Sequence, residues 1–567
     1  MTNVDRSARL RNLISLYSLF FLARVASQQL SSAFVHPPSD FVRKKNRCSA
    51  LTTLWRNAED QSSPPIPSFD DWTSLGDIST ENIAVTMIEG MRGVQAKAEI
   101  TSGTLIMSVP TELCLEDLDD NLFQETSLGK VPKAEWQALD LFWISKLAIV
   151  FINEKSKGKD SNWAAWLKSL PASGPSMPGA WGGSVGVGGA AARAELQDPL
   201  LQAEVHVITD LLSSQYDQMR QLSKEHSVDI GQTISKKHFI DTVHFIQSRA
   251  FLVNIQGKKR HLLIPFMDMF NHKPEADSII FYNEETQSVQ LRVGYSLSAG
   301  EQVFINYGDF TNSEMLKYYG FVPENNQKHD NIVFQGVCKE EDLEDLGLNS
   351  ADLGETDIGK ETALRTFLQE LCKESIEEGS SFTSIEGCSF TIGLPGLQRE
   401  YVAALRLSVA TGQELAEAGG PEGVLGSVRA DPAFVLSRAN EVRVARVAAR
   451  RCARALAAHP TSAAEDRRAL RAAAAGEEKR RGRAAAEEEG EAGPAAAAEG
   501  EAWVLALRYR LARKELLAGL VGRLDAYAAY AEAGGEGEGE KLPSLNAFLY
   551  WYKSSPTFRT SVQQYCT

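Results

Sequence analysis

Short apolar runs of the strand type stand on both sides of a long stretch with helical periodicity. The runs at 84–88 and 104–110 are separated by glycine turns, and similar runs return between residues 260 and 307. From about residue 133 to residue 250, the apolar residues instead recur at helical spacing. The order of the two patterns predicts strands, then a block of helices, and then strands again.

The helical block predicts individual elements. One buried helix is expected near its start, because these apolar residues share one face at helical spacing: Trp136, Leu139, Phe142, Trp143 and Leu147. Residues 194–250 indicate two or three further helices, the last of them at 238–246. The glycine-rich piece 179–189 predicts a loop. Further along, residues 312–319 predict one short helix.

The composition changes after residue 330. Residues 339–359 are acidic, and helical spacing then dominates. An example of this spacing is the set Leu397, Tyr401, Leu405 and Val409. Residues 472–502 are mostly Ala, Glu and Gly, and a segment with so little apolar bulk predicts a solvated or disordered insertion. Helix is expected to return at 503–524.

Bulk properties exclude some classes of protein. A chain of 567 residues is too long for one core and predicts two or three domains with tails. The net charge of −15 argues against nucleic acid as the main partner, since phosphate binding needs clustered Lys and Arg. The seven cysteines are scattered and never form a C-x-x-C pair, which indicates buried thiols in a reducing compartment. No metal site is expected.

Residues 1–50 have the pattern of a targeting leader. Arginines at 6, 9 and 11 precede an apolar run at 13–23, which is too short to span a bilayer but long enough for a signal-peptide core. Small residues then lead to Phe34, and a basic, acid-poor segment follows at 43–47. This order resembles the bipartite plastid leaders of algae with secondary plastids; an ordinary secretory signal is the alternative. Residues 51–80 read as a linker, and no membrane span is expected after leader removal.

Four motifs occur in a fixed order within the strand-rich parts of the chain. They are Gly90-Met91-Arg92-Gly93-Val94, Ser248-Arg249-Ala250-Phe251, Asp268-x-x-Asn271-His272, and the run from Gly300 to Tyr307 that leads to Tyr319-Gly320-Phe321. Each motif alone is a weak signal. In this order, over roughly residues 81–545, they resemble the SET-domain protein-lysine methyltransferases of the Rubisco large-subunit methyltransferase type.

The resemblance implies an α+β fold. Residues 81–323 would form a mostly β SET core, which a helical insertion at about 133–250 interrupts. Residues 335–545 would form an all-α substrate-binding domain that contains the low-complexity segment 472–502. Residues 546–567 would be a tail. Because this chain lacks the cysteine-rich module of other SET branches, the resemblance also implies that no metal is needed.

The resemblance further implies S-adenosylmethionine as cofactor and assigns roles to residues. The expected cofactor-binding residues are Glu89, Gly90, Met91, Arg92, Arg249, Asn271, His272 and Phe321. The expected substrate-binding residues are Phe251, Asp268, Tyr282 and Tyr307. Tyr319 is expected to place its hydroxyl beside the transferring methyl group, and Tyr307 to shape the lysine channel.

Other interpretations of these residues stay open. Phe251 and Phe321 could be ordinary core residues, and Asp268 could cap a turn. The family often has a basic residue two positions after the Phe, where this chain has Val253. A polar contact to the substrate is therefore expected to be missing.

The expected function is methylation of a lysine in a non-histone protein, such as Rubisco large subunit or a plastid aldolase. The C-terminal helical domain would bind part of that protein, and the enzyme is expected to be a plastid monomer. One alternative is a protein-histidine methyltransferase of the same SET branch, although Phe251 makes the pocket apolar and favours lysine. Another is a non-catalytic, SET-derived binding module.

Overall fold

The computed structural model describes residues 68–554, apart from 81, 89, 117–123, 127, 140, 182–186, 229–233, 345, 348–359, 361, 368–388, 432, 485–493 and 534–541. The chain divides into two compact units. The first comprises residues 1–194, 198–323 and 492–505, and the second residues 195–197, 324–491 and 506–567. The predicted leader, most of the linker and residues 555–567 lie outside the described residues. The domain boundaries drawn from the sequence stay predictions.

Strands from both sides of the helical block share sheets in the first unit. One sheet has the order β1-β2-β10-β7, formed by Ile83–Ile88, Met91–Ala96, Gln302–Ile305 and Asn271–His272. A second has the order β3-β9-β8, formed by Leu105–Pro110, Ser288–Val293 and Ser278–Asn283. A third has the order β4-β6-β5, formed by Leu115–Glu116, Lys258–Leu263 and Ala250–Ile255. Each sheet therefore joins segments that lie more than a hundred residues apart in the chain.

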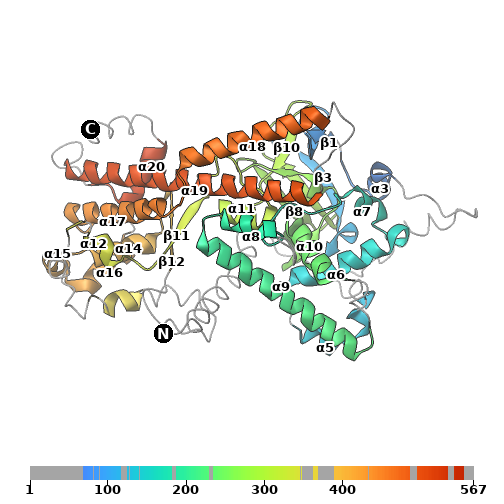
Figure 1. Ribbon diagram of the computed structural model, residues 1–567, viewed down its shortest axis with the longest axis horizontal. Coiled ribbons are helices and arrows are strands. Elements are labelled where there is room, and N and C mark those ends of the chain that lie inside the picture. The colour runs from blue at the N-terminus through green and yellow to red at the C-terminus, as the bar shows by residue number, and fades with distance from the viewer. Residues whose placement is uncertain are drawn as a thin grey trace, which may run out of the picture. The chain divides into compact units, whose positions relative to one another are not determined.

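Helices of the first unit fill the stretch between β4 and β5 and gather beside the strands (Figure 1). They include α5 (Lys133–Gln137), α6 (Trp143–Ser156), α7 (Ala164–Ser169), α8 (Val187–Ala194), α9 (Pro199–Glu225) and α10 (Lys236–Gln247). Asp198 and Ser235 cap α9 and α10 with their side chains, as these residue types do at helix starts. The α+β fold with a helical insertion is confirmed.

The single helix expected over 136–147 is wrong. The structure ends α5 at Gln137 and begins α6 at Trp143, after Phe142 in an extended conformation with ψ of 149°. Both Trp136 and Leu147 are buried in the core of this unit. The spacing of apolar residues predicts which side chains are buried, but it does not predict whether the helix is interrupted between them.

The glycine-rich piece 179–189 was expected to be a loop. Residues 182–186 of this piece lie outside the described residues, and α8 begins at Val187, so its last part is helical. Gly179, at the start of the same piece, packs closely against the His244 ring. A Cβ added at Gly179 would lie 2.6 Å from that ring.

The second unit is helical around a small sheet. Its sheet has the order β11-β12-β13, formed by Asn331–Gln335, Ser389–Gly393 and Gly396–Leu397, and the helical pattern did not predict it. The helices include α12 (Glu340–Glu344), α14 (Arg399–Ser408), α15 (Gly412–Glu417), α16 (Gly420–Ala430), α17 (Arg438–Ala457), α18 (Ala463–Ala484), α20 (Leu545–Ser554) and the part of α19 (Pro494–Glu532) that begins at residue 506.

Disorder is the wrong expectation for the described parts of 472–502. Residues 472–484 belong to α18 and residues 494–502 to α19, whereas 485–493 lie outside the described residues. Ala, Glu and Arg have high helix propensity, so a segment without apolar bulk can still be helical.

A buried ion pair joins α14 to α17 in the second unit. Arg406 and Glu441 are 3% and 0% exposed, and the Arg406 guanidinium donates two hydrogen bonds to the Glu441 carboxylate. The Tyr527 hydroxyl donates to the same carboxylate over 3.0 Å.

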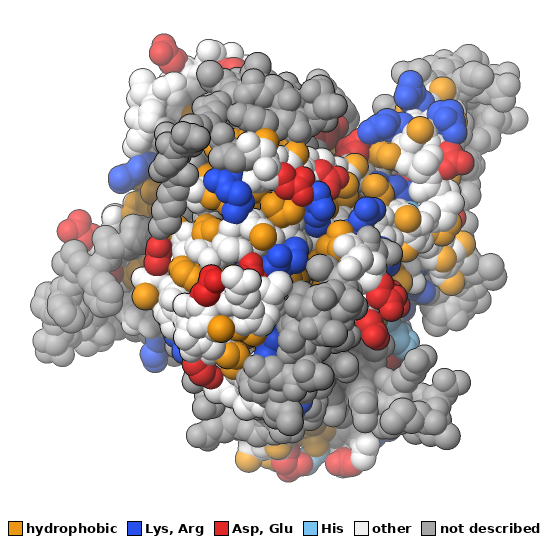
Figure 2. Space-filling model, turned by 90° about the vertical axis from the view of Figure 1, so that its left-hand side faces the viewer, with side chains coloured by type: hydrophobic (Ala, Val, Ile, Leu, Met, Phe, Trp, Pro, Cys, Tyr) orange, Lys and Arg blue, Asp and Glu red, His pale blue; other side chains and the backbone are white. Residues whose placement is uncertain are grey.

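On the face shown in Figure 2, acidic and basic side chains are interspersed with hydrophobic ones at the surface. No helix in the described part of the chain is long and apolar enough to cross a membrane.

Candidate active site

Parallel pairing of β7 with β10 brings two of the predicted motifs together. Phe304 is paired with Asn271 and Ile305 with His272, so the chain that leaves β10 passes the His272 ring. The backbone N–H of Tyr307 donates a hydrogen bond to His272 Nδ1 over 3.0 Å. This bond makes Nδ1 an acceptor and therefore places the proton of a neutral His272 on Nε2.

Asn271 connects this pair of strands to the glycine hairpin between β1 and β2. Its Nδ2 donates a hydrogen bond to the Arg92 carbonyl over 3.1 Å. Gly93 makes the approach possible, because an added Cβ would lie 3.0 Å from Asn271 Nδ2 and 2.5 Å from Gln302 Nε2. The first of the glycine turns expected after residue 88 is short, because β2 already begins at Met91 and Gly90 takes a positive φ of 83°.

Tyr319 is the last residue of α11 (Asn312–Tyr319), which ends as the sequence predicted. A capping box between Thr311 and Glu314 fixes the start of this helix. Gly320 ends it in the left-handed conformation, at φ 74°. An added Cβ at Gly320 would lie 2.9 Å from both Pro175 Cβ and the Ser176 carbonyl oxygen, so only glycine fits there.

Four aromatic rings from the predicted set form one cluster. The centroids of Tyr307 and Tyr319 are 4.9 Å apart, and those of His272 and Tyr307 are 5.0 Å apart. Phe321 lies 5.9 Å from His272 and 6.4 Å from each tyrosine. Segments from β7, the end of β10 and the end of α11 thus converge at one place.

The two tyrosine hydroxyls differ in their surroundings. Tyr307 donates a hydrogen bond to the Phe270 carbonyl over 2.6 Å. No hydrogen-bond partner is found for the Tyr319 hydroxyl among the described residues. Burial raises the pKa of Tyr307 to about 12, and burial and Tyr307 raise the pKa of Tyr319 further. Both hydroxyls therefore stay neutral at physiological pH and act as hydrogen-bonding groups rather than as bases.

A charged cluster lies beside the rings. Arg249 Nη1 donates to the Asp268 carbonyl over 2.9 Å and to Asp268 Oδ2 over 3.3 Å. Arg92 is near enough that the positive charge of Arg249, together with burial, lowers the pKa of Arg92. Burial raises the pKa of Asp268, whereas the charges of Arg249 and Arg92 oppose that rise. Two cations and one carboxylate leave this cluster with an excess of positive charge.

Some of these groups border one cavity, whose empty volume of about 710 Å³ includes its opening to solvent. Five of the predicted residues line it: Arg249, Phe251, Asp268, Tyr307 and Tyr319. Most of the other lining residues are apolar, among them Phe270, Ile280 and Phe310.

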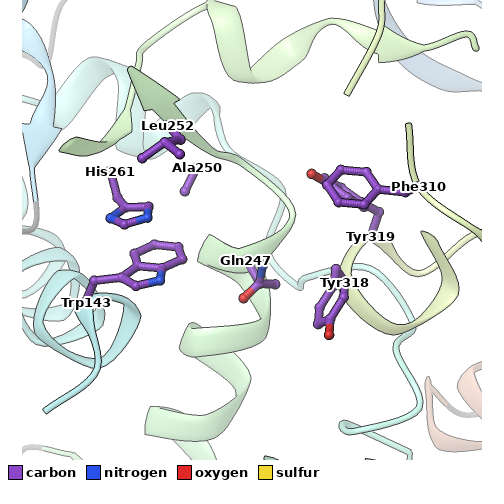
Figure 3. A pocket seen from close by; sticks show the side chains of 8 residues that line it. All are labelled: Trp143, Gln247, Ala250, Leu252, His261, Phe310, Tyr318 and Tyr319. Atoms are coloured by element: carbon purple, nitrogen blue, oxygen red, sulfur yellow. The ribbon is translucent and has the colours of Figure 1, made fainter. Parts of the chain in front are cut away.

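A second, smaller cavity adjoins it and shares Ala250, Leu252, Phe310 and Tyr319 with the first. Figure 3 shows the Trp143 and His261 rings together on one side of this cavity and Phe310 and Tyr319 on the other. The Trp143 and His261 rings are stacked, with centroids 3.9 Å apart.

The remaining predicted residues lie in different places. Glu89 lies outside the described residues. Gly90 is exposed and Met91 is 67% exposed, at the tip of the hairpin. Tyr282 lies on β8, two residues beyond Ile280 on the same strand face, but it does not line the cavity. Val253 is 3% exposed, so it belongs to the core.

Sequence reasoning missed several residues around the site. Phe310 lines both cavities, and Phe270 supplies the carbonyl that binds Tyr307. Trp166 donates its indole N–H to Asp268, and the Ser169 carbonyl accepts from Arg92 Nη1. Phe270 and Phe310 stand next to predicted motifs and could have been considered. Trp166 and Ser169 carry no local signal, because they reach the site only through the tertiary fold.

Comparisons with known proteins agree with this architecture. Residues 91–308 match the SET domain, and residues 373–517 match the domain described as Rubisco LSMT substrate-binding. The fold and the family match define a protein that contains a SET domain. More particularly, the two matched regions together resemble the SET-domain methyltransferases of the Rubisco large-subunit type.

Curated relatives are distant and only partly covered. The actin-histidine N-methyltransferase of Drosophila melanogaster is 24% identical over 278 residues, which is 46% of this chain and 50% of that protein. SET domain-containing protein 4 of Mus musculus is 25% identical over 248 residues, 41% of this chain and 53% of that protein. The chain thus spans about half the length of these relatives.

The solved structures cover more of the chain. Rubisco LSMT bound to sinefungin and monomethyllysine aligns with a TM-score of 0.52 and 18% identity, over 83% of this chain and 94% of that one. The SET domain of LSMT bound to lysine and AdoHcy aligns with a TM-score of 0.51 and 17% identity, over 82% of this chain and 92% of that one. At these identities the likeness concerns the fold.

Proposed function

We propose that this protein is an S-adenosylmethionine-dependent protein-lysine N-methyltransferase. One observation carries the proposal: Tyr307 and Tyr319 meet Arg249 and Asp268 in a single cavity, in the fold of the SET family. The structural neighbours were solved with AdoHcy or sinefungin, and one of them with monomethyllysine. Their ligands supply the chemical classes proposed here.

The charged cluster fits the carboxylate of the cofactor. Arg249 Nε is a buried donor without a hydrogen-bond partner among the described residues. The cluster also carries an excess positive charge, from Arg249 and Arg92 against Asp268. A carboxylate from outside the chain would bond the free N–H and neutralise the excess charge. Asn271 and His272, beside the hairpin, would hold the rest of the cofactor.

S-adenosylmethionine supplies an electrophilic methyl group when it is bound. A free lysine is protonated at neutral pH, with a pKa of about 10.4, and is then not nucleophilic. The apolar walls of the cavity, Phe251 and Phe270, disfavour a charged amine and lower its pKa. Tyr307, held by the Phe270 carbonyl, would shape the channel. Tyr319 would present its hydroxyl to the amine and the methyl group, and so orient the two reacting atoms.

The pH dependence of kcat follows from these groups. We expect kcat to rise with pH and to level off below pH 10.4, because the bound lysine must lose its proton and its pKa is lowered. No fall is expected up to pH 10, because the pKa of Tyr307 is about 12 and that of Tyr319 is also raised. Steady-state kinetics between pH 6 and 10 measure this. A decline that begins below pH 10 would show that an ionisable tyrosine, or another base, controls the reaction.

Gly93→Ala is expected to weaken cofactor binding about tenfold, since the new Cβ would push aside the Gln302 side chain and move Asn271 Nδ2 away from the Arg92 carbonyl. Isothermal titration with S-adenosylhomocysteine measures the change. Gly426→Ala is the matched control, because no atom lies within 4 Å of a Cβ added there. Equal affinities of the two variants would contradict the assigned role of Asn271.

The apolar part of the cavity lining favours a lysine target over histidine. Phe251, Phe270 and Phe310 would pack against an aliphatic side chain. Asn306 and Asp268 line the same cavity and are polar groups that could also bond an imidazole. A relative in the same branch methylates a histidine of actin, so the choice needs a direct test. The purified protein should transfer label from S-adenosylmethionine to a protein in plastid extract, and peptide mass spectrometry should place the methyl group on lysine. A methylated histidine would favour the alternative, and no label would remove support for an enzyme.

The plastid location is proposed from the leader alone. A fusion of residues 1–50 to a fluorescent protein should enter the plastid, and its appearance in the medium would favour a secretory signal.

The proposed protein substrate would be bound in part by the region that matches the Rubisco LSMT substrate-binding domain. A binding module without catalysis is the remaining alternative, and a melting temperature that does not respond to S-adenosylmethionine would favour it.

A further inference from the structure

Helix α7 of the insertion is linked to both cations of the site, to one of them directly and to the other through Asp268. The indole N–H of Trp166 donates to Asp268 Oδ1 over 3.4 Å, while Asp268 Oδ2 accepts from Arg249. Three residues further on, the Ser169 carbonyl accepts from the Arg92 guanidinium. One turn of helix thus contacts Arg92 directly and Arg249 through Asp268.

One oxygen of the Asp268 carboxylate depends on Trp166 for its hydrogen bond. The Asp268 side chain is fully buried, as is Trp166. Among the described residues, the Trp166 N–H is the only donor to Oδ1, and Arg249 is the donor to Oδ2. A buried carboxylate oxygen without a donor is costly, so the loss of the Trp166 N–H would favour rotation or protonation of Asp268. Either change would weaken the contact of Arg249 with Oδ2 and leave the guanidinium held by the Asp268 backbone carbonyl alone.

We propose that Trp166 is a positioning residue of the cofactor site, which holds Asp268 so that Arg249 is oriented toward the carboxylate of the cofactor. This inference rests on the proposed function. It assigns a role in ligand binding to the helical insertion, in addition to the strand motifs. Trp166 itself does not line the cavity, so it acts only through Asp268.

Two ligands separate positioning from a general structural role. S-adenosylhomocysteine carries the amino-acid carboxylate, whereas 5′-methylthioadenosine lacks it. Trp166→Phe should weaken binding of S-adenosylhomocysteine about tenfold, the size expected for one hydrogen bond to a charged group, and leave 5′-methylthioadenosine binding unchanged. Isothermal titration of the full chain measures both.

Trp163→Phe is the matched control. Trp163 is also buried and donates its indole N–H over 2.7 Å, but to the Leu113 carbonyl. It should lose a similar amount of stability and bind both ligands as the wild type does. If Trp166→Phe does not fold, 3-benzothienylalanine can replace Trp166, because it keeps the shape and lacks the N–H.

The outcomes separate this inference from the proposed function. Loss of affinity for S-adenosylhomocysteine alone supports the role of Trp166. An equal loss for both ligands, or no loss for either, overturns it. A wild-type protein that binds neither ligand contradicts the proposed function itself, and Trp166 then has no cofactor to position.

Discussion

Tyr319→Phe is expected to lower kcat about a hundredfold, the usual cost of removing one preorganised polar group at a reacting centre. At 25 °C this corresponds to about 2.7 kcal/mol in the activation free energy. The Tyr319 hydroxyl has no hydrogen-bond partner among the described residues, so its removal breaks no bond within the fold. The melting temperature and the affinity for S-adenosylhomocysteine should therefore stay near the wild-type values. Single-turnover transfer of labelled methyl groups measures the rate.

Tyr216→Phe provides the control for this variant. Tyr216 is 3% exposed, and its hydroxyl donates to the Ile234 carbonyl over 2.7 Å, away from the cavity. This change should cost about 1 kcal/mol in stability and leave the rate unchanged. If Tyr319→Phe retains the wild-type rate, the hydroxyl beside the methyl group must come from another residue, and Tyr307→Phe becomes the next variant to measure.

Arg406→Leu is expected to destabilise the second unit by about 3–5 kcal/mol, because it leaves a buried carboxylate without its cation. Glu441 is 0% exposed, and among the described residues its carboxylate would keep only the Tyr527 hydroxyl as a donor. Chemical denaturation followed by circular dichroism measures the change in the free energy of unfolding. Protein substrate binding should weaken with it, if the second unit holds the substrate.

The double variant Arg406→Leu, Glu441→Leu tests the cause. Removing both charges should restore most of the lost stability, since no buried charge is then left alone. Arg446→Leu is the surface control: its partner Glu532 is 45% exposed, and a pair of this kind contributes about 0–1 kcal/mol. A double variant as unstable as Arg406→Leu would show that packing, rather than charge, accounts for the effect.

Much of the fold followed from local patterns. Short apolar runs predicted β1 and β3, and the short helix expected over 312–319 has the bounds of α11. The break between α5 and α6 was missed, because Trp136 and Leu147 keep helical spacing across it. The sheet of the second unit was missed as well, because its strands are short and two of them are separated by more than fifty residues.

The motifs that supply the site residues were predicted, but the residues that hold those side chains in place were not. Resemblance pointed to Arg249, Asp268, Tyr307 and Tyr319, and the structure brings them to one cavity. Their roles as substrate or cofactor ligands stay predictions. The sequence could not reveal that Trp166 lies behind Asp268, since 102 residues separate them and only the packing of α7 joins them.

The pairing of β2 with β10 has a consequence for synthesis. Val94 pairs with Val303, so more than two hundred residues must be made before β2 acquires its second neighbour. On the ribosome, the hairpin of β1 and β2 emerges early with one open edge, and such edges pair readily with other chains. Contacts this distant in sequence also form slowly. The nascent protein should therefore need a chaperone until residue 305 has left the exit tunnel, and chains truncated before that residue should aggregate rather than fold.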